Sequence, residues 1–177
     1  MISHSNFTLA PSWMLGAARK LGLQGSANSA NNIPTQQVQE FLKAVHAPLL
    51  TTEKDGSTHV THWCAAFANA CLKEAGIAGT NSAAANSFLH WGSPLTEPRF
   101  GTICVLKRKG GNHVAFFVDT FPDGALLLLG GNQGHMVRFG KFTKIHLHTN
   151  GYRWPSFLHK GMPQDSALGL GGGLMSV

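Results

Sequence analysis

The 177-residue sequence has no long hydrophobic run and only three cysteines. No apolar segment approaches the ~20 residues that a membrane-spanning helix needs, so we expect no stable membrane insertion. The first residues, MISHSNFTLAPSWM, lack the basic and apolar regions of a secretory signal, which predicts synthesis in the cytoplasm without such a signal. Three cysteines form no paired disulfide framework, and a reducing compartment of synthesis is the simplest inference.

Charged side chains are also scarce, because Asp, Glu, Lys and Arg make up only 12% of the sequence while hydrophobic residues make up 43%. This balance predicts a globular protein with a rather neutral surface, and the length suits one domain with a sizeable core. The net charge of +6 and a pI near 9.6 favour an anionic partner, such as nucleic acid, anionic lipid or an anionic cell-wall polymer. The densest basic run, residues 107–109, is more typical of a solvated hairpin tip.

Periodic apolar residues predict four helices in the first half of the chain. The clearest patterns are residues 34–47, with apolar positions at i, i+3, i+4 and i+7, and residues 61–76, which end at a glycine typical of a helix C-terminus. Two shorter helices are expected at residues 11–22 and 82–92. Residues 48–60 are interpreted as an irregular polar connection.

The periodicity changes after residue 100, where strand-like runs alternate with Gly, Asn, Pro and Asp. We expect strands at residues 101–108, 113–120, 125–132, 136–140 and 144–149, and the segment YRWP at residues 152–155 is expected to close the domain. Helices followed by a meander of strands predict an α+β fold, in which N-terminal helices pack on an antiparallel sheet of about five to six strands. Residues 1–155 are expected to form one domain, and the Gly-rich residues 156–177 a flexible tail.

The stretch THWCAAFANACLKEAG, within the third predicted helix, raises the question of what Cys64 does. His59 and His62 lie close to Cys64 and Cys71, but the spacing H-x2-H-x-C-x6-C matches no common structural zinc site. A disulfide is disfavoured because residues seven apart on a helix lie ~10 Å apart along its axis. Both cysteines fall on the apolar stripe of the helix, which is typical of core residues.

Cys64 differs from the other cysteines in its position. Cys71 and Cys104, the latter inside a predicted strand, are interpreted as core residues. Cys64 lies in the first turn of its helix, where unpaired backbone N–H groups and the helix dipole favour a thiolate. A nucleophile needs such a position, and it also needs a base nearby.

The best candidate base is His113, because of the strand pairing that we predict around it. The sequence FPDG at residues 121–124 is expected to form the turn between two strands, with Asp119 paired to Leu126. The same register places His113 directly opposite Asn132, with Cβ atoms ~5 Å apart. The sheet would then present an imidazole beside a carboxamide, as in a Cys–His–Asn arrangement whose Asn holds the ring in the useful tautomer. A one-residue slip of the register would separate the pair.

Five other histidines compete for the role of base, and for each a solvent-exposed or hydrogen-bonded structural role is favoured. They are His59, His62, His135, His146 and His148. Among the candidates, His113 alone has an Asn at the predicted paired position.

Seven stretches carry a resemblance to a known family. They are PSWMLGAARKLG, HWCAAFANACLKEAG, GTNSAAANSFLHWG, PRFGTICVLKR, NHVAFFVD, LLLLGGNQ and YRWP, which together cover about residues 11–155. In this order and spacing they resemble the CHAP and NlpC-type cysteine peptidase/amidase superfamily, whose core is papain-like. The chain is most similar to a subfamily found in phage lysis proteins and bacterial toxins, with residues 11–47 as an N-terminal helical extension and residues 61–155 as the core. One departure is Asn112, because the family commonly has Gly before the catalytic histidine.

The resemblance implies a peptidoglycan hydrolase that cleaves either the amide between N-acetylmuramic acid and L-alanine or a bond within the stem peptide. By position it makes Cys64 the nucleophile, His113 the general base and then acid, and Asn132 the orienting residue. Gln133 is expected to contact the substrate or the oxyanion. Trp63, next to the nucleophile, is the tryptophan that we expect to line the substrate groove. The resemblance implies no metal or organic cofactor.

The implied substrate lies outside the cytoplasm, so the enzyme would act in the periplasm or cell wall of a target cell, as a secreted effector or a phage-released lysin. An effector would require a cognate immunity protein that covers the Cys64 cleft. The positive charge suits a wall polymer rich in carboxylates and phosphates, and no nucleic-acid partner is expected. Two alternatives stay open: a cysteine-dependent protease or deamidase toxin that acts on proteins, and a non-catalytic basic wall-binding module.

Overall fold

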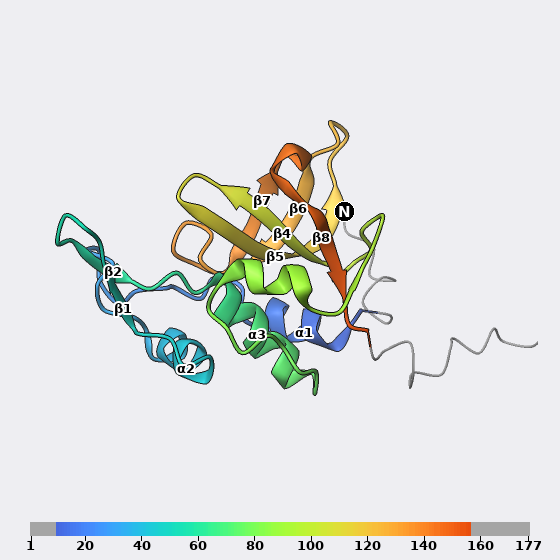
Figure 1. Cartoon of the computed structure of the whole chain (residues 1–177). Helices are drawn as coiled ribbons and strands as arrows, with labels where there is room; N and C mark the ends of the chain where they lie inside the picture. Colours follow the sequence, from blue (N-terminus) through green and yellow to red (C-terminus); the bar gives the residue numbers. More distant parts are fainter. Residues whose placement is uncertain (1–9, 157–177) are drawn as a thin grey trace, which may run out of the picture.

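Six antiparallel strands form the main sheet of the protein, and helices cover one of its faces (Figure 1). The structure, a computed structural model, describes residues 10–156. In spatial order the strands are β3 (Ser93–Pro94), β8 (Leu147–Trp154), β4 (Ile103–Arg108), β5 (Gly111–Thr120), β6 (Leu126–Gly130) and β7 (Arg138–Phe142). The predicted α+β class, with an antiparallel sheet of about five to six strands, is confirmed. The predicted Gly-rich tail, apart from its first residue, lies outside the described residues.

Three α-helices precede the sheet along the chain: α1 (Ser12–Arg19), α2 (Gln36–Ala44) and α3 (Cys64–Glu74). Each lies inside a predicted helix. The fourth predicted helix, by contrast, is only a 3-10 helix, η2 (Ala85–His90). The Ser87 hydroxyl donates to the Ala84 carbonyl at 2.6 Å, and such a local bond competes with α-helical hydrogen bonding.

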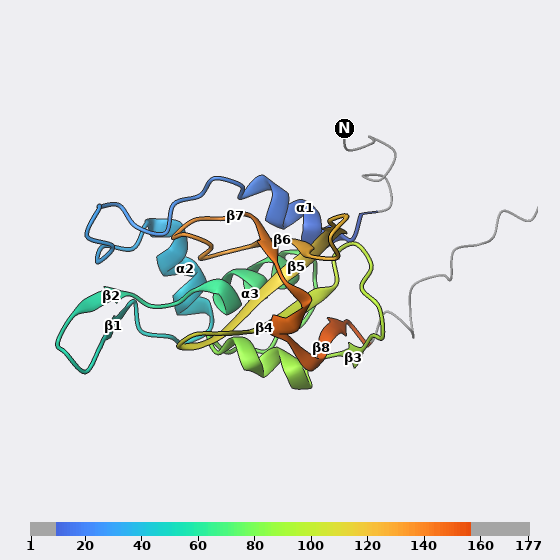
Figure 2. The ribbon, with the colours of Figure 1, turned by 90° about the horizontal axis from the view of Figure 1, so that it is seen from above.

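A two-stranded hairpin occupies the stretch that the sequence predicted to be irregular. In it, β1 (Leu50–Thr52) pairs with β2 (Thr58–Val60). Threonine and valine favour strands, and Gly56 supplies the positive φ of +84° that the turn requires. The hairpin extends beyond the end of the main sheet at the side where α3 begins (Figures 1 and 2).

The last strand is longer than predicted. The second half of the expected strand 144–149 continues through residues 152–154 in β8, while Lys144–His146 form a 3-10 turn, η3. The chain bends at Asn150, whose φ is +57°, yet β8 pairs with β4 on both sides of this bend.

The β5–β6 hairpin keeps the predicted register near one end and loses it near the turn. A bulge between Phe117 and Asp119 shifts the pairing, so Asp119 lies opposite Leu127 instead of Leu126. Farther from the turn, Phe116 pairs with Leu129, which is the predicted register.

The two faces of the sheet belong to different hydrophobic clusters. Val114 and Phe116 of β5 pack in the cluster that includes side chains of all three α-helices. Ala115 and Phe117 pack in a second cluster on the opposite face. Because side chains alternate along a strand, His113 belongs to this second face.

A segment that follows α1 is hydrogen-bonded to the loop between β6 and β7. The Gly22 N–H donates to the Val137 carbonyl at 2.8 Å, and the Gly25 N–H donates to the His135 carbonyl at 2.6 Å. Helices α1 and α2 also share one hydrophobic cluster with α3. The predicted helical extension, residues 11–47, is therefore part of the main core, and it holds a loop that borders the candidate site.

Candidate active site

Cys64 is the first residue of α3, as the sequence predicted, and the residue is only 4% exposed. Burial raises the pKa of its thiol above the ordinary value, whereas the backbone N–H groups of Val114 and Ala65 bond the sulfur and lower the pKa. The same donors would stabilise a thiolate once it forms. The start of α3 therefore places the sulfur against backbone donors from both a helix and a strand.

A gap in the sheet lets the sulfur reach β5. The β4–β5 pairing continues to the first residue of β5, whereas the β5–β6 pairing begins only at Phe116. The Phe117 N–H donates to the Thr102 carbonyl, on the β4 side, at 2.7 Å. Since successive N–H groups of a strand alternate in direction, the Val114 N–H faces the β6 side, where the ladder has ended. This N–H acts on the Cys64 thiol and lowers its pKa, against the larger effect of burial.

His113 lies near the start of β5 and is 1% exposed. Its Nε2 lies 3.0 Å from the Oε1 of Gln133. The amide nitrogen of Gln133 donates to the carbonyls of Leu128 and Arg138, so the amide oxygen must be the atom that faces the imidazole. It follows that the Nε2 of His113 carries the proton, and that Nδ1 keeps the lone pair that a base needs.

Burial lowers the pKa of His113 to about 4, well below its ordinary value of 6.5. The hydrogen bond to Gln133 raises this pKa, while the charges of Arg108 and His62 lower it further. The ring also stacks on Phe142, with centroids 5.5 Å apart. At neutral pH the imidazole is therefore uncharged and able to accept a proton.

One pocket of about 320 Å³ brings the candidate residues together. Cys64, His113 and Asn132 all line it. Its other walls come from the β4–β5 turn and the β6–β7 loop, which lie at the end of the main sheet where α3 begins (Figure 1). The remaining lining residues are His62, Arg108, Lys109, Gly110, Gly111, Asn112, Gly134 and His135.

The hydrogen-bond partner of His113 is Gln133, which corrects the expected pairing with Asn132. Strand β6 ends at Gly130, and Asn132 has a φ of +56°, so the chain leaves the strand geometry before it comes opposite His113. Gln133 is 4% exposed and contacts the imidazole. Contrary to the expectation, it therefore does not face a substrate in the pocket. The two successive glycines before Asn132, typical of a strand end, are the sequence signal for this change.

Trp63 does not line the pocket, contrary to expectation. It is 1% exposed and packs with Phe41 and Phe67, at centroid distances of 6.4 Å for each pair. Gly25 and Gly131 lie so close to the indole that a Cβ on either would come within 2.9 Å of it. Trp63 is therefore a core residue that fixes the start of α3.

Two histidines that the sequence favoured for structural roles, His62 and His135, line the pocket. The His62 ring stacks on His59, with centroids 5.3 Å apart, and His59 bonds Glu53 at 2.9 Å. His135 lies 3.0 Å from the amide nitrogen of Asn31. The predicted hydrogen-bonded roles hold for His59 and His135. The sequence spacing alone did not reveal that His62 and His135 line the same pocket as Cys64.

Asn112, the departure from the family pattern, fits its position in β5. Its φ lies outside the left-handed region, so the backbone does not need a glycine there. Its side-chain oxygen is 2.7 Å from the Nε2 of His148, which links β5 to β8 at the edge of the pocket. The start of β5 therefore accommodates Asn112 without moving His113 out of the strand.

The other interpretations of the cysteines can be compared with the same geometry. All three cysteines are free and buried. Burial raises the pKa of Cys71 to about 12 and raises that of Cys104 as well, consistent with the predicted core roles. Within residues 10–156, no group of three His, Cys, Asp or Glu side chains is arranged to hold a metal ion. In the same part of the chain, no helix is both long enough and apolar enough to cross a bilayer.

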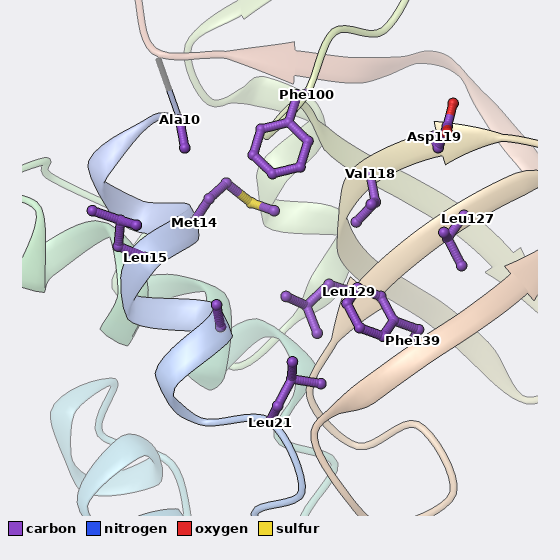
Figure 3. Close-up of a pocket in the computed structure, with 11 residues that line it drawn as sticks. Ala10, Met14, Leu15, Leu21, Phe100, Val118, Asp119, Leu127, Leu129 and Phe139 are labelled. Atoms are coloured by element: carbon purple, nitrogen blue, oxygen red, sulfur yellow. The ribbon is translucent and has the colours of Figure 1, made fainter. Parts of the chain in front are cut away.

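A second cavity, of about 180 Å³, lies between α1 and the strands β5, β6 and β7 (Figure 3). Met14 and Leu21 reach it from the helical side, and Leu129 and Phe139 from the sheet. It shares no residue with the Cys64 pocket and contains neither a thiol nor an imidazole. Its chemistry is that of an apolar recess.

Comparison of the chain with protein-family models, with curated proteins and with solved structures found no match.

Proposed function

We propose that the protein is a cysteine-dependent hydrolase that cleaves an amide bond of peptidoglycan. The observation that carries this proposal is that one pocket is lined both by Cys64, at a helix start, and by His113, whose tautomer is set by Gln133. A helix that begins with a thiol and packs on an antiparallel sheet that carries the histidine is also what a papain-like core would require. The family resemblance of the sequence supports the same assignment.

The proposed reaction begins with transfer of the Cys64 proton to Nδ1 of His113. The thiolate then attacks the amide carbonyl, and the backbone N–H groups around the sulfur favour the negative charge. The imidazolium protonates the leaving amine, which leaves a thioester on Cys64. His113 then removes a proton from water, and the resulting attack releases the acid and restores the thiol.

Gln133 takes the orienting role in this proposal. Its amide oxygen accepts the Nε2 proton of His113, so the basic nitrogen can only be Nδ1. The carbonyls of Leu128 and Arg138 fix the amide in turn. Asn132, which lines the pocket, is left free to contact the substrate.

Digestion of purified peptidoglycan, followed by mass spectrometry of the fragments, tests the proposal. The wild-type protein is expected to release fragments with a newly exposed amine and carboxylate, which also identifies the bond. Cys64→Ala is expected to release none. Cys71→Ala is the matched control, because it removes a buried thiol that does not line the pocket.

Three results would contradict the assignment. Hydrolysis at an undiminished rate by Cys64→Ala would show that Cys64 is not the nucleophile, and would favour a different site or a contaminating enzyme. Intact peptidoglycan together with cleaved or deamidated protein substrates would support the alternative toxin function. If the protein binds the wall but no variant hydrolyses any substrate, the basic binding module is the better assignment.

The proposed site of action is the periplasm or wall of a target cell, reached either by a secretion machine or by phage-mediated lysis. An effector of this kind must be neutralised in the cell that makes it. The immunity protein proposed for that purpose would cover the pocket around Cys64. Such a partner would protect the producing cell when it is co-expressed with the wild-type protein. It would make no difference beside Cys64→Ala, which is expected to be non-toxic by itself.

A further inference from the structure

Apart from Cys64 and His113, the titratable side chains that line the pocket are all basic. Arg108 ends β4 and Lys109 begins the following turn, while His62 and His135 lie on the opposite walls. No Asp or Glu side chain lines the pocket. We call Arg108, Lys109, His62 and His135 the basic rim.

Arg108 carries a positive charge that no ion pair within residues 10–156 neutralises. It is exposed, and within residues 10–156 no carboxylate lies within ion-pair distance of its guanidinium. Its charge nevertheless acts on the site, since it lowers the pKa values of Cys64, His113 and His62. The residue lines the same pocket as both proposed reacting groups, and no ion pair among the described residues occupies its donors.

We propose that the basic rim is a carboxylate-binding subsite, in which Arg108 holds a free carboxylate of the substrate beside the amide that Cys64 attacks. The choice of a cell-wall peptide as substrate rests on the proposed function, whereas the subsite itself rests on the geometry of the rim. A planar guanidinium offers paired donors that match a carboxylate, and the imidazoles of the rim add single donors. A pocket of about 320 Å³ has room for the reacting carbonyl and for one small anionic group.

The subsite restricts the substrate class. A peptide with a free carboxylate next to the cleaved amide is expected to react faster than the same peptide with a carboxamide there. The stem peptides of cell walls occur in both forms, so Arg108 would distinguish amidated from unamidated walls. Asn132, which also lines the pocket, supplies no charge and is not expected to make this distinction.

The subsite can be tested without any wall substrate by alkylation of Cys64. Iodoacetate and iodoacetamide react alike, because the thiolate sulfur bonds the CH₂ carbon and iodide leaves, but only iodoacetate carries a carboxylate. Their rates at Cys64 are measured at pH 7.5 by mass spectrometry of the tryptic peptide. The ratio of the two rates, divided by the ratio for glutathione, cancels differences in thiol reactivity between variants.

We expect Arg108→Gln to lower this normalised ratio by roughly fivefold, the effect of one charge at ~4 Å in water. Arg108→Lys should retain part of the preference, because it keeps the charge but not the paired donors. Lys73→Gln is the matched control, since it removes an exposed cation from the far end of α3 and should leave the ratio unchanged. Burial keeps His113 uncharged at this pH, so the imidazole does not attract iodoacetate in its place.

A normalised ratio near one in the wild type, or an equal ratio in Arg108→Gln, would overturn the subsite. Failure of both reagents to modify Cys64 would also overturn it, because no small anion would then reach the sulfur past the rim. The proposed function is judged separately by wall digestion. A preference for iodoacetate without wall cleavage would contradict the proposed substrate but support the subsite. Wall cleavage without the preference would support the proposed substrate but contradict the subsite.

Discussion

At the scale of single residues, the chemistry of the site depends on one side-chain amide. Gln133 has two carbonyl partners for its nitrogen and one imidazole for its oxygen, so its orientation is determined by its neighbours. That orientation selects the tautomer of His113. Without it, the proton could occupy Nδ1, and the ring would have no basic nitrogen in the place where the proposed mechanism needs it.

Replacing Gln133 with Leu is expected to lower kcat by roughly 10- to 100-fold, because the tautomer and ring orientation of His113 are lost. The hydrogen bond to Gln133 raises the pKa of His113, so the acid limb of the kcat/KM profile should also move to lower pH. Asn132→Leu serves as the comparison, since Asn132 lines the pocket but does not bond the imidazole. If Asn132→Leu shifted the acid limb and Gln133→Leu did not, the orienting role would belong to Asn132.

Burial of His113 also predicts how stability depends on pH. Its pKa is about 4 in the folded protein and near 6.5 in the unfolded chain, so the unfolded chain binds more protons between these values. The contribution to folding is fully present above pH 6.5 and is lost as pH falls toward 4. Between pH 7.5 and 4.5 the loss should be about 2–3 kcal/mol.

Urea unfolding at pH 7.5 and pH 4.5 measures this dependence. In His113→Gln, which cannot be protonated, the difference in unfolding free energy between the two pH values should shrink by about that amount. Other acidic groups and histidines contribute equally to both proteins and cancel in the comparison. An identical pH dependence in the variant would mean that His113 titrates near its ordinary pKa.

At the scale of elements, the contact between α3 and the end of β6 aligns the two halves of the site. Gly131 leaves just enough space for this contact. A Cβ at this position would lie 2.6 Å from the Trp63 ring and 2.7 Å from the Cβ of Phe67. The helix that carries Cys64 and the loop that carries Gln133 therefore meet without an intervening side chain.

Gly131→Ala is expected to destabilise the protein by about 1–3 kcal/mol, the usual cost of overpacking a core, and to reduce hydrolysis by moving Gln133 away from His113. Thermal unfolding and initial rates measure the two effects. Gly16→Ala is the control, because the added methyl meets only the end of the flexible Glu74 side chain. Unchanged stability and activity in Gly131→Ala would show that the loop can move without consequence.

Elements with strong periodicity were predictable from the sequence, and elements fixed by local side-chain bonds were not. The regular stripe of α3 placed Cys64 in the first turn, and the runs of β-branched and aromatic residues located β4 and β5. It was not predictable that Gln133, and not Asn132, bonds His113, because this depends on where β6 ends in three dimensions. Trp63 was misassigned because its neighbour in sequence faces the pocket while the indole faces the core.

At the scale of the whole molecule, the N-terminal helices and the sheet share one hydrophobic core. Side chains from α1 and α2 lie in the same cluster as α3 and the helix-facing side of the sheet. Trp13 also donates a hydrogen bond from its indole to the Gly101 carbonyl, at 2.9 Å, just before β4. Removing the helices would expose the surface of α3 that they cover.

A shortened protein of residues 48–177 is therefore expected to lose cooperative unfolding and hydrolytic activity together. Near-ultraviolet circular dichroism and thermal unfolding, measured beside the full chain, would report the loss of fixed packing. A version that begins at residue 10 is the control, because it keeps α1 and α2. A well-folded and active 48–177 protein would show that the helices are an independent attachment.

The hydrogen bonds from Gly22 to Val137 and from Gly25 to His135 have a consequence for inhibition. A single proteolytic cut between residues 26 and 33 is expected to leave the thiol, the imidazole and the amide chemically intact, yet to loosen the backbone that fixes the loop of Gln133. An inhibitor that displaced the segment of Gly22 and Gly25 from the β6–β7 loop would have the same effect. Such a molecule would abolish the proposed hydrolysis from the outer surface of the protein, with the sulfur still uncovered.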